Sequence, residues 1–195
     1  MSALDGLLTS EGARIVLDTN AAWGLRRLAH LADRVARLNE VLHAPLGLVV
    51  PAPAHMEMLF DLRQRYGPQY DAAAVAQGLM DKGIHVEPFG VEDADRAAAR
   101  LAEKFPAAGD WHRAKRKRCL HCLGVPATAS RATGKGCGAT LDWLIAVHGT
   151  REGWILVTDD SDPEFEGVPR KATLVELEAS LDRLIAARCG PAPSR

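Results

Sequence analysis

Short apolar runs alternate with longer amphipathic stretches along the chain. Four apolar runs are bounded by turn or polar residues: 15–17, 48–50, 84–86 and 154–157. Runs this short are typical of strands in a parallel sheet that is buried on both faces. The other stretches repeat apolar residues about every 3.6 positions, which predicts five helices: 21–42, 53–65, 92–105, 139–148 and 173–188. Alternating strands and helices predict an α/β fold with crossover helices.

One stretch interrupts the alternation. Residues 106–138 show no clear periodicity but contain basic residues, glycines and three of the four cysteines. A loop of this length within a compact domain is typically functional or disordered. We therefore interpret it as an insertion in one domain, with residues 1–13 as an N-terminal extension and residues 181–195 as a C-terminal tail.

The composition is that of an ordinary globular protein. The 195 residues are 47% hydrophobic and 25% charged, with a net charge of −1. No apolar run reaches the ~18 residues of a membrane span, and the N-terminus lacks the pattern of a signal peptide. We therefore expect a cytoplasmic protein without a membrane partner. In that compartment clustered cysteines indicate metal binding rather than disulfides.

Carboxylates stand where the predicted strands end and the predicted helices begin. Five of them do so: Asp18, Glu57, Asp142, Asp159 and Asp160. Taken singly, each is also explained as a helix cap or a turn residue. Strand ends of a parallel sheet converge on one edge, however, and carboxylates gathered there repel one another unless a cation neutralises them. Oxygen ligands alone favour Mg²⁺ or Mn²⁺.

Four segments carry a family resemblance. In order, IVLDTN, APAHMEML, GATLDWLIAVH and LVTDD resemble the acidic motifs of PIN-domain ribonucleases, and most closely those of VapC-type toxins from bacterial toxin–antitoxin pairs. The resemblance covers about residues 14–105 and 138–170. It implies a PIN-like three-layer domain over 14–180, in which helices flank a central parallel sheet of about five strands.

The resemblance also implies Mg²⁺- or Mn²⁺-dependent cleavage of RNA phosphodiester bonds. Asp18, Asp142 and Asp160 then bind the metal, and Glu57 completes the catalytic group and orients or deprotonates the attacking water. Asp160 is preferred over Asp159 because the last acid of the family usually stands two positions after the threonine.

Three neighbouring polar residues complete this picture. Thr158 and Asn20 are expected to contact the metal-ligating carboxylates without binding the metal themselves. Asn20 is also suited to begin the next helix. Asp162 either adds to the last acidic group or lies in solvent.

The resemblance further implies partners. They are an RNA substrate, a cognate antitoxin and a second copy of the chain in a homodimer. The insertion and the terminal extensions depart from the shorter toxins of the family. Two alternatives therefore stay open: a PIN-type nuclease of RNA processing, and a non-catalytic RNA-binding module whose acids serve only as caps.

The insertion contains a second candidate metal site. Cys119 and Cys122 have the spacing with which two thiolates bind one tetrahedral Zn²⁺, and Cys137 follows. A fourth ligand is needed, for which His112 or His121 is available. The alternative is that these are free thiols.

The same insertion is strongly basic. Residues 111–136 include no acidic residue, and a run of cations lies within them: Arg113, Lys115, Arg116, Lys117 and Arg118. Such a patch on a nearly neutral protein predicts contacts with RNA phosphates. A solvated loop without a ligand has the same composition.

Overall fold

Five parallel strands form one central sheet. The computed structural model describes residues 2–107, 109–114 and 139–189. The strands are β1 (Arg14–Leu17), β2 (Gly47–Pro51), β3 (Ile84–Glu87), β4 (Trp154–Val157) and β5 (Lys171–Ala172). They pair in the order β3-β2-β1-β4-β5, so β1 lies in the middle. The predicted α/β architecture is thereby confirmed, and the four apolar runs of the sequence are its first four strands.

Burial explains why three successive positions of each central strand are apolar. Residues 15–17 of β1 and 155–157 of β4 are at most 1% exposed. Their register places Ile15 opposite Ile155 and Leu17 opposite Val157. Only the first residue of β1, Arg14, is exposed, so the alternation typical of a half-exposed strand is missing from the rest of these strands.

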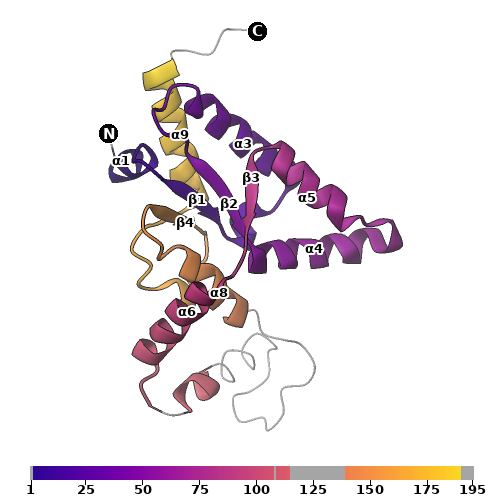
Figure 1. Cartoon of the computed structure of the whole chain (residues 1–195), viewed down its shortest axis with the longest axis vertical. Coiled ribbons are helices and arrows are strands. Elements are labelled where there is room, and N and C mark those ends of the chain that lie inside the picture. The colour runs from indigo at the N-terminus through magenta and orange to yellow at the C-terminus, as the bar shows by residue number, and fades with distance from the viewer. Residues whose placement is uncertain (1, 108, 115–138, 190–195) are drawn as a thin grey trace.

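Helices flank the sheet (Figure 1). In the described part of the chain they are α1 (Ala3–Leu8), α2 (Thr19–Ala22), α3 (Leu25–Asn39), α4 (Ala52–Tyr66), α5 (Ala72–Asp81), α6 (Val91–Lys104), α8 (Ala139–His148) and α9 (Leu174–Cys189), with two short 3-10 helices, η1 (Gly67–Gln69) and η2 (Pro163–Phe165). Within these segments, none of the helices has the length and apolar character needed to cross a membrane.

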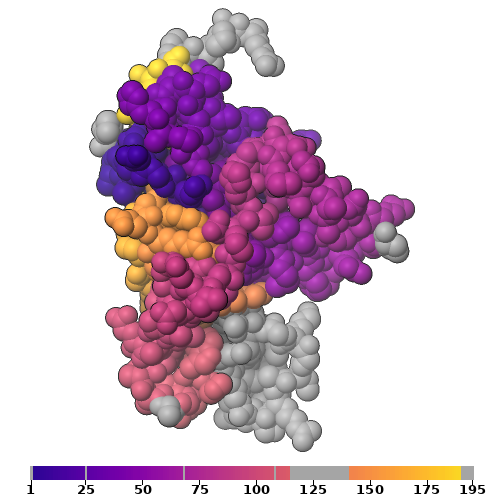
Figure 2. All heavy atoms as spheres, viewed as in Figure 1, coloured from indigo at the N-terminus to yellow at the C-terminus, as the bar shows by residue number. Residues whose placement is uncertain are grey.

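The helices pack in two groups. Helix α9 packs against α3 and α1, while α8 packs against α4 and α6. In Figure 1 the sheet lies between these groups. Figure 2 shows α4 and α5 projecting together from the body of the molecule. The second group contributes Glu57 and Asp142 to the carboxyl edge of the sheet.

The structure adds helices that the sequence pattern did not predict. Helix α5 buries only Leu79, so its apolar periodicity is weak. Helix α1 packs on α9, although residues 1–13 were expected to be an extension. Helix α9 agrees with the helix predicted over 173–188, and it buries Leu181 and Leu184, so residues 181–189 are part of the helix as well as of the expected C-terminal segment. Helices α1 and α9 thus pack together on the core.

A buried ion-pair network joins β3, α6 and the turn before β4. Arg151 donates through Nη1 to Glu87 Oε1 at 2.6 Å and through Nη2 to Asp93 Oδ2 at 2.5 Å. Its guanidinium also lies 4.4 Å from the ring centroid of Trp154. Burial raises the pKa of Asp93, but hydrogen bonds from Arg151 and Gly90 outweigh it and lower the pKa overall. Arg151 therefore fixes α6 relative to the sheet.

Substitution of Arg151 tests this network. Arg151→Met leaves the carboxylate of Asp93, which is 1% exposed, without its main partner. We expect the free energy of unfolding in urea to fall by about 3–5 kcal/mol. Arg34→Met, which removes an exposed pair with Asp182, is the control and costs less than about 1 kcal/mol. Equal losses in the two variants would contradict the proposed role of Arg151.

Candidate metal centre

Strand β1 delivers Asp18 to the carboxyl edge of the sheet. The backbone N–H of Asp18 donates to the Val157 carbonyl at 3.0 Å, so the pairing of β1 with β4 extends to this residue. Asp18 Oδ1 accepts from the N–H of Thr19 at 2.6 Å and caps α2. The side chain is only 2% exposed. Asp18 thus serves as a helix cap and still presents a carboxylate at the end of the central strand.

The end of β4 supplies the partners of Asp18. Thr158 Oγ1 donates to Asp18 Oδ2 at 2.7 Å and accepts from the N–H of Asp160 at 3.0 Å. Asn20 Nδ2 donates to Asp160 Oδ2 at 3.1 Å. Hydrogen bonds therefore link Asp18 to Thr158, Thr158 to Asp160 and Asp160 to Asn20, across the ends of the two central strands. This is the supporting geometry that the sequence predicts for Asn20 and Thr158.

The carboxylate of Asp159 has a different partner from that of Asp160. Its Oδ1 accepts from the N–H of Leu174 at 3.0 Å, at the first residue of α9. Asp160 instead contacts Asn20, and it lies close enough to Asp18 for its charge to raise the pKa of Asp18. The preference for Asp160 over Asp159 as the candidate ligand agrees with this placement.

Glu57 joins the group from α4. The helix begins directly after β2, and its first turns bury Pro53 and Ala54 against the core. Glu57 Oε2 accepts a hydrogen bond from Thr19 Oγ1. The residue that follows Asp18 therefore holds the carboxylate of Glu57 beside the end of β1.

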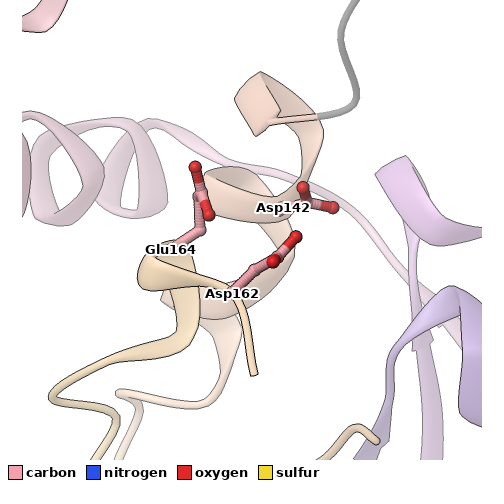
Figure 3. Close-up of side chains that lie close together, drawn as sticks. All are labelled: Asp142, Asp162 and Glu164. Carbon is pink, nitrogen blue, oxygen red and sulfur yellow. The ribbon is translucent and has the colours of Figure 1, made fainter. Parts of the chain in front are cut away.

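Asp142 enters from the first turn of α8 and meets two further acids. Oxygen atoms of Asp142, Asp162 and Glu164 all lie within 4.8 Å of one another. Figure 3 shows Asp142 on α8 facing Asp162 and Glu164, which come from the segment at η2. Asp142 and Asp162 are half-buried and Glu164 is 6% exposed. This spacing of the three carboxylates would allow one cation to contact all of them.

The electrostatics show that the acids share one region. Burial raises the pKa of Asp18 to about 6, with smaller contributions from the charges of Asp160 and Glu57, against hydrogen bonds that lower it. Burial likewise raises the pKa of Asp142 to about 7, and the charges of Asp18 and Glu57 add to the shift, as do those of Glu164 and Asp160. The charges of the neighbouring acids thus disfavour the ionised forms of Asp18 and Asp142.

Basic partners do not relieve this repulsion at the four predicted site acids. In the part of the chain that the structure describes, none of Asp18, Glu57, Asp142 and Asp160 forms an ion pair with Lys, Arg or His. Of these acids Asp18 is buried and the other three are half-buried, and a divalent cation stabilises a cluster of this kind, whose ligands are all oxygen atoms. The donor set therefore fits Mg²⁺ or Mn²⁺.

The position in the sheet is that of a ligand site. From β1 the chain adds β2 and β3 on one side, whereas β4 and β5 lie on the other. In open parallel sheets, ligands bind in the crevice outside the strand ends where this direction changes. Asp18 follows β1 and Asp160 follows β4, so the two acids border that crevice.

Sequence reasoning did not find Glu164 and left Asp162 undecided. Both lie in a short segment between β4 and β5, where loop carboxylates are ordinarily exposed. The signal in the sequence is weak, because the only unusual feature is an acid directly before Phe165, which is 1% exposed. Burial of this segment against α8 depends on long-range packing.

The structure reaches only the start of the insertion. His112 and Arg113 are exposed, and Arg113 pairs with Asp110. The other predicted zinc ligands and basic residues lie outside the described residues: Cys119, His121, Cys122, Cys137, Lys115, Arg116, Lys117 and Arg118. The zinc site and the basic patch therefore stay predictions. Cys189 is a free thiol near the Arg37 carbonyl, at the end of α9.

Comparison of the chain with protein-family models and with curated proteins finds no match.

The raised pKa values predict an unusual pH dependence of stability. Asp18 and Asp142 have an ordinary pKa of 3.8 when unfolded, against about 6 and about 7 in the folded chain. Between about pH 4 and pH 7 the folded state therefore binds more protons, and the free energy of unfolding falls as the pH rises through this window. Urea unfolding in EDTA measures the fall.

Asp142→Asn is the matched variant for this experiment. The amide cannot ionise, so stability should depend less steeply on pH between 5 and 7, and added Mn²⁺ should stabilise the variant less than the wild type. Equal pH slopes for the two proteins would contradict the assignment of a raised pKa to Asp142.

Proposed function

We propose that this protein is a Mg²⁺- or Mn²⁺-dependent endoribonuclease that cleaves RNA phosphodiester bonds. The observation that supports the proposal best is the gathering of Asp18, Glu57, Asp142 and Asp160 at the carboxyl edge of a parallel sheet, where the described residues supply no ion pair to any of the four. Such a cluster is costly for the fold, and the cap that Asp18 provides to α2 does not require the other three acids beside it. Its cost is explained when it binds a divalent cation.

The residues divide between binding and chemistry. Asp18, Asp142 and Asp160 hold the cation, and Asp162 and Glu164 offer further oxygen atoms beside Asp142. A bound Mg²⁺ or Mn²⁺ supplies charge stabilisation for the phosphate and lowers the pKa of water. Glu57 orients or deprotonates the attacking water. Its position is set by the hydrogen bond from Thr19 Oγ1.

Supporting residues fix the acids without adding charge. Thr158 bridges Asp18 and the backbone of Asp160, and Asn20 donates to the side chain of Asp160. Hydroxyl and amide donors hold a carboxylate in place but leave its charge for the cation. Lysine or arginine in these places would compete with the metal.

The substrate is unpaired RNA, since a single strand can be splayed across an open acidic edge. Cations at the start of the insertion, such as the exposed Arg113, are suited to phosphate contacts. The resemblance to VapC-type toxins supports a toxin role, with an antitoxin and a second copy of the chain as partners in the cytoplasm. A PIN-type nuclease of RNA processing is the alternative within the same chemistry.

Neighbouring aspartates offer a sharp test of the catalytic proposal. Asp160→Asn should reduce cleavage of a single-stranded RNA by about 100-fold or more in Mn²⁺, because a ligand charge is lost. Asp159→Asn is the control, since an amide oxygen can still accept from the N–H of Leu174, and it should cleave like the wild type. Cleavage is measured on a labelled oligonucleotide, with Asp18→Asn as a second inactive variant.

The same assay separates the alternatives. If wild-type protein cleaves RNA equally well in EDTA and in Mn²⁺, the metal-dependent mechanism is wrong. If it binds RNA without cleaving it, and binding survives EDTA but is lost on removal of residues 106–138, the chain is an RNA-binding module. Equal activity of Asp160→Asn and Asp159→Asn would contradict the assigned ligand.

A further inference from the structure

Two cations of α6 hold the segment that carries Asp162 and Glu164. Arg100 Nη2 donates to the carbonyls of Glu166 at 2.9 Å and Glu164 at 3.4 Å. One turn later, Lys104 Nζ donates to the carbonyl of Pro163 at 2.6 Å and pairs with Glu166 Oε2 at 2.8 Å. Three carbonyl contacts, at Pro163, Glu164 and Glu166, thus fix the backbone of residues 163–166 to α6.

The same two cations also contact α8. The guanidinium of Arg100 lies 5.5 Å from the ring centroid of Trp143, and Lys104 Nζ lies 5.6 Å from it. Trp143 is 3% exposed and directly follows Asp142. A large buried ring at this position fixes the rotation of the first turn of α8 and therefore the direction of Asp142.

Helix α6 is itself anchored. Asp93 in its first turn is held by Arg151, whose other partner, Glu87, is on β3. At the other end, Phe105 packs against Trp143 and Trp111, with ring centroids 6.3 and 5.5 Å away. Arg100 and Lys104 therefore act from a fixed element and not from a mobile loop.

We infer that Arg100 and Lys104 are positioning residues that hold Asp162 and Glu164 against Asp142 and thereby set the affinity of the site for a divalent cation. This inference rests on the proposed function. Three carboxylates within 4.8 Å repel one another, and an unrestrained segment would move two of them away. Arg100 grips backbone carbonyls, and the carboxylate that Lys104 pairs with is Glu166, outside this cluster.

The hydrogen bonds of both side chains go to backbone carbonyls and to Glu166, which lies outside the cluster. Arginine at position 100 adds a flat guanidinium that donates and stacks on Trp143 at once, which lysine cannot reproduce.

Direct binding of Mn²⁺ tests the inference without any need for RNA cleavage. Titration calorimetry or the electron spin resonance of free Mn²⁺ gives the dissociation constant for the full chain. We expect Arg100→Met to raise this constant about tenfold, as is usual when a group that orients metal ligands is lost. Arg100→Lys keeps the charge and one donor, so its affinity should lie between those of the wild type and Arg100→Met.

Arg96→Met is the matched control. Arg96 lies one turn before Arg100 on α6, and its partners are Glu92 and Asp93 of the same helix. Its removal should leave Mn²⁺ affinity unchanged. A purely structural effect of Arg100→Met would reduce the fraction of protein that binds but not the dissociation constant, and cleavage at saturating Mn²⁺ should recover in the variant if only affinity is affected.

The outcomes separate this inference from the proposed function. If wild-type protein binds Mn²⁺, Asp142→Asn abolishes the binding and Arg100→Met binds like the wild type, the role of Arg100 and Lys104 is wrong and the metal centre stands. If wild-type protein does not bind Mn²⁺, or Asp142→Asn binds equally well, the proposed function fails together with the inference. The inferred role of Arg100 and Lys104 would also be wrong if the dissociation constant for Mn²⁺ were unchanged in Arg100→Lys and raised in Arg96→Met.

Discussion

The parallel pairing of β1 with β4 is the constraint on which the candidate site depends. It continues past the last strand residue, through the hydrogen bond from the Asp18 N–H to the Val157 carbonyl. Thr158 then bridges Asp18 and Asp160. The sheet order changes direction at this pair of strands, which is where open parallel sheets bind ligands. Backbone pairing thus decides where the first two acids meet.

The price of this arrangement is electrostatic. Burial and mutual repulsion raise the pKa of Asp142 to about 7 and that of Asp18 to about 6. Around them the described structure supplies neutral donors from Thr19, Asn20 and Thr158, while arginine and lysine contact the backbone behind the cluster. Among the described residues, Asp18, Glu57, Asp142 and Asp160 are thus held near one another without an ion pair to Lys, Arg or His, which suits a cation site.

Support for the site comes from segments far away in the chain. Arg151 anchors α6 to β3, and α6 in turn holds residues 163–166 and Trp143. None of these contacts follows a local sequence pattern. Arg100 and Lys104 read in the sequence as ordinary cations on an exposed helix face, and Glu164 reads as a loop acid. Their roles arise only when α6, α8 and η2 pack together.

The sequence by itself determined four of the five strands and the parallel α/β class, because buried strands are apolar over most of their length. It also singled out Asp18, Glu57, Asp142 and Asp160, because acids at predicted strand ends and helix starts stand out beside apolar runs. The tertiary structure decided the rest. It directed Asp159 to the N–H of Leu174 at the start of α9, added Asp162 and Glu164 to Asp142, and packed α1 against α9. Each of these features joins segments that are far apart in the sequence. No periodic pattern marks them, so only long-range packing specifies them.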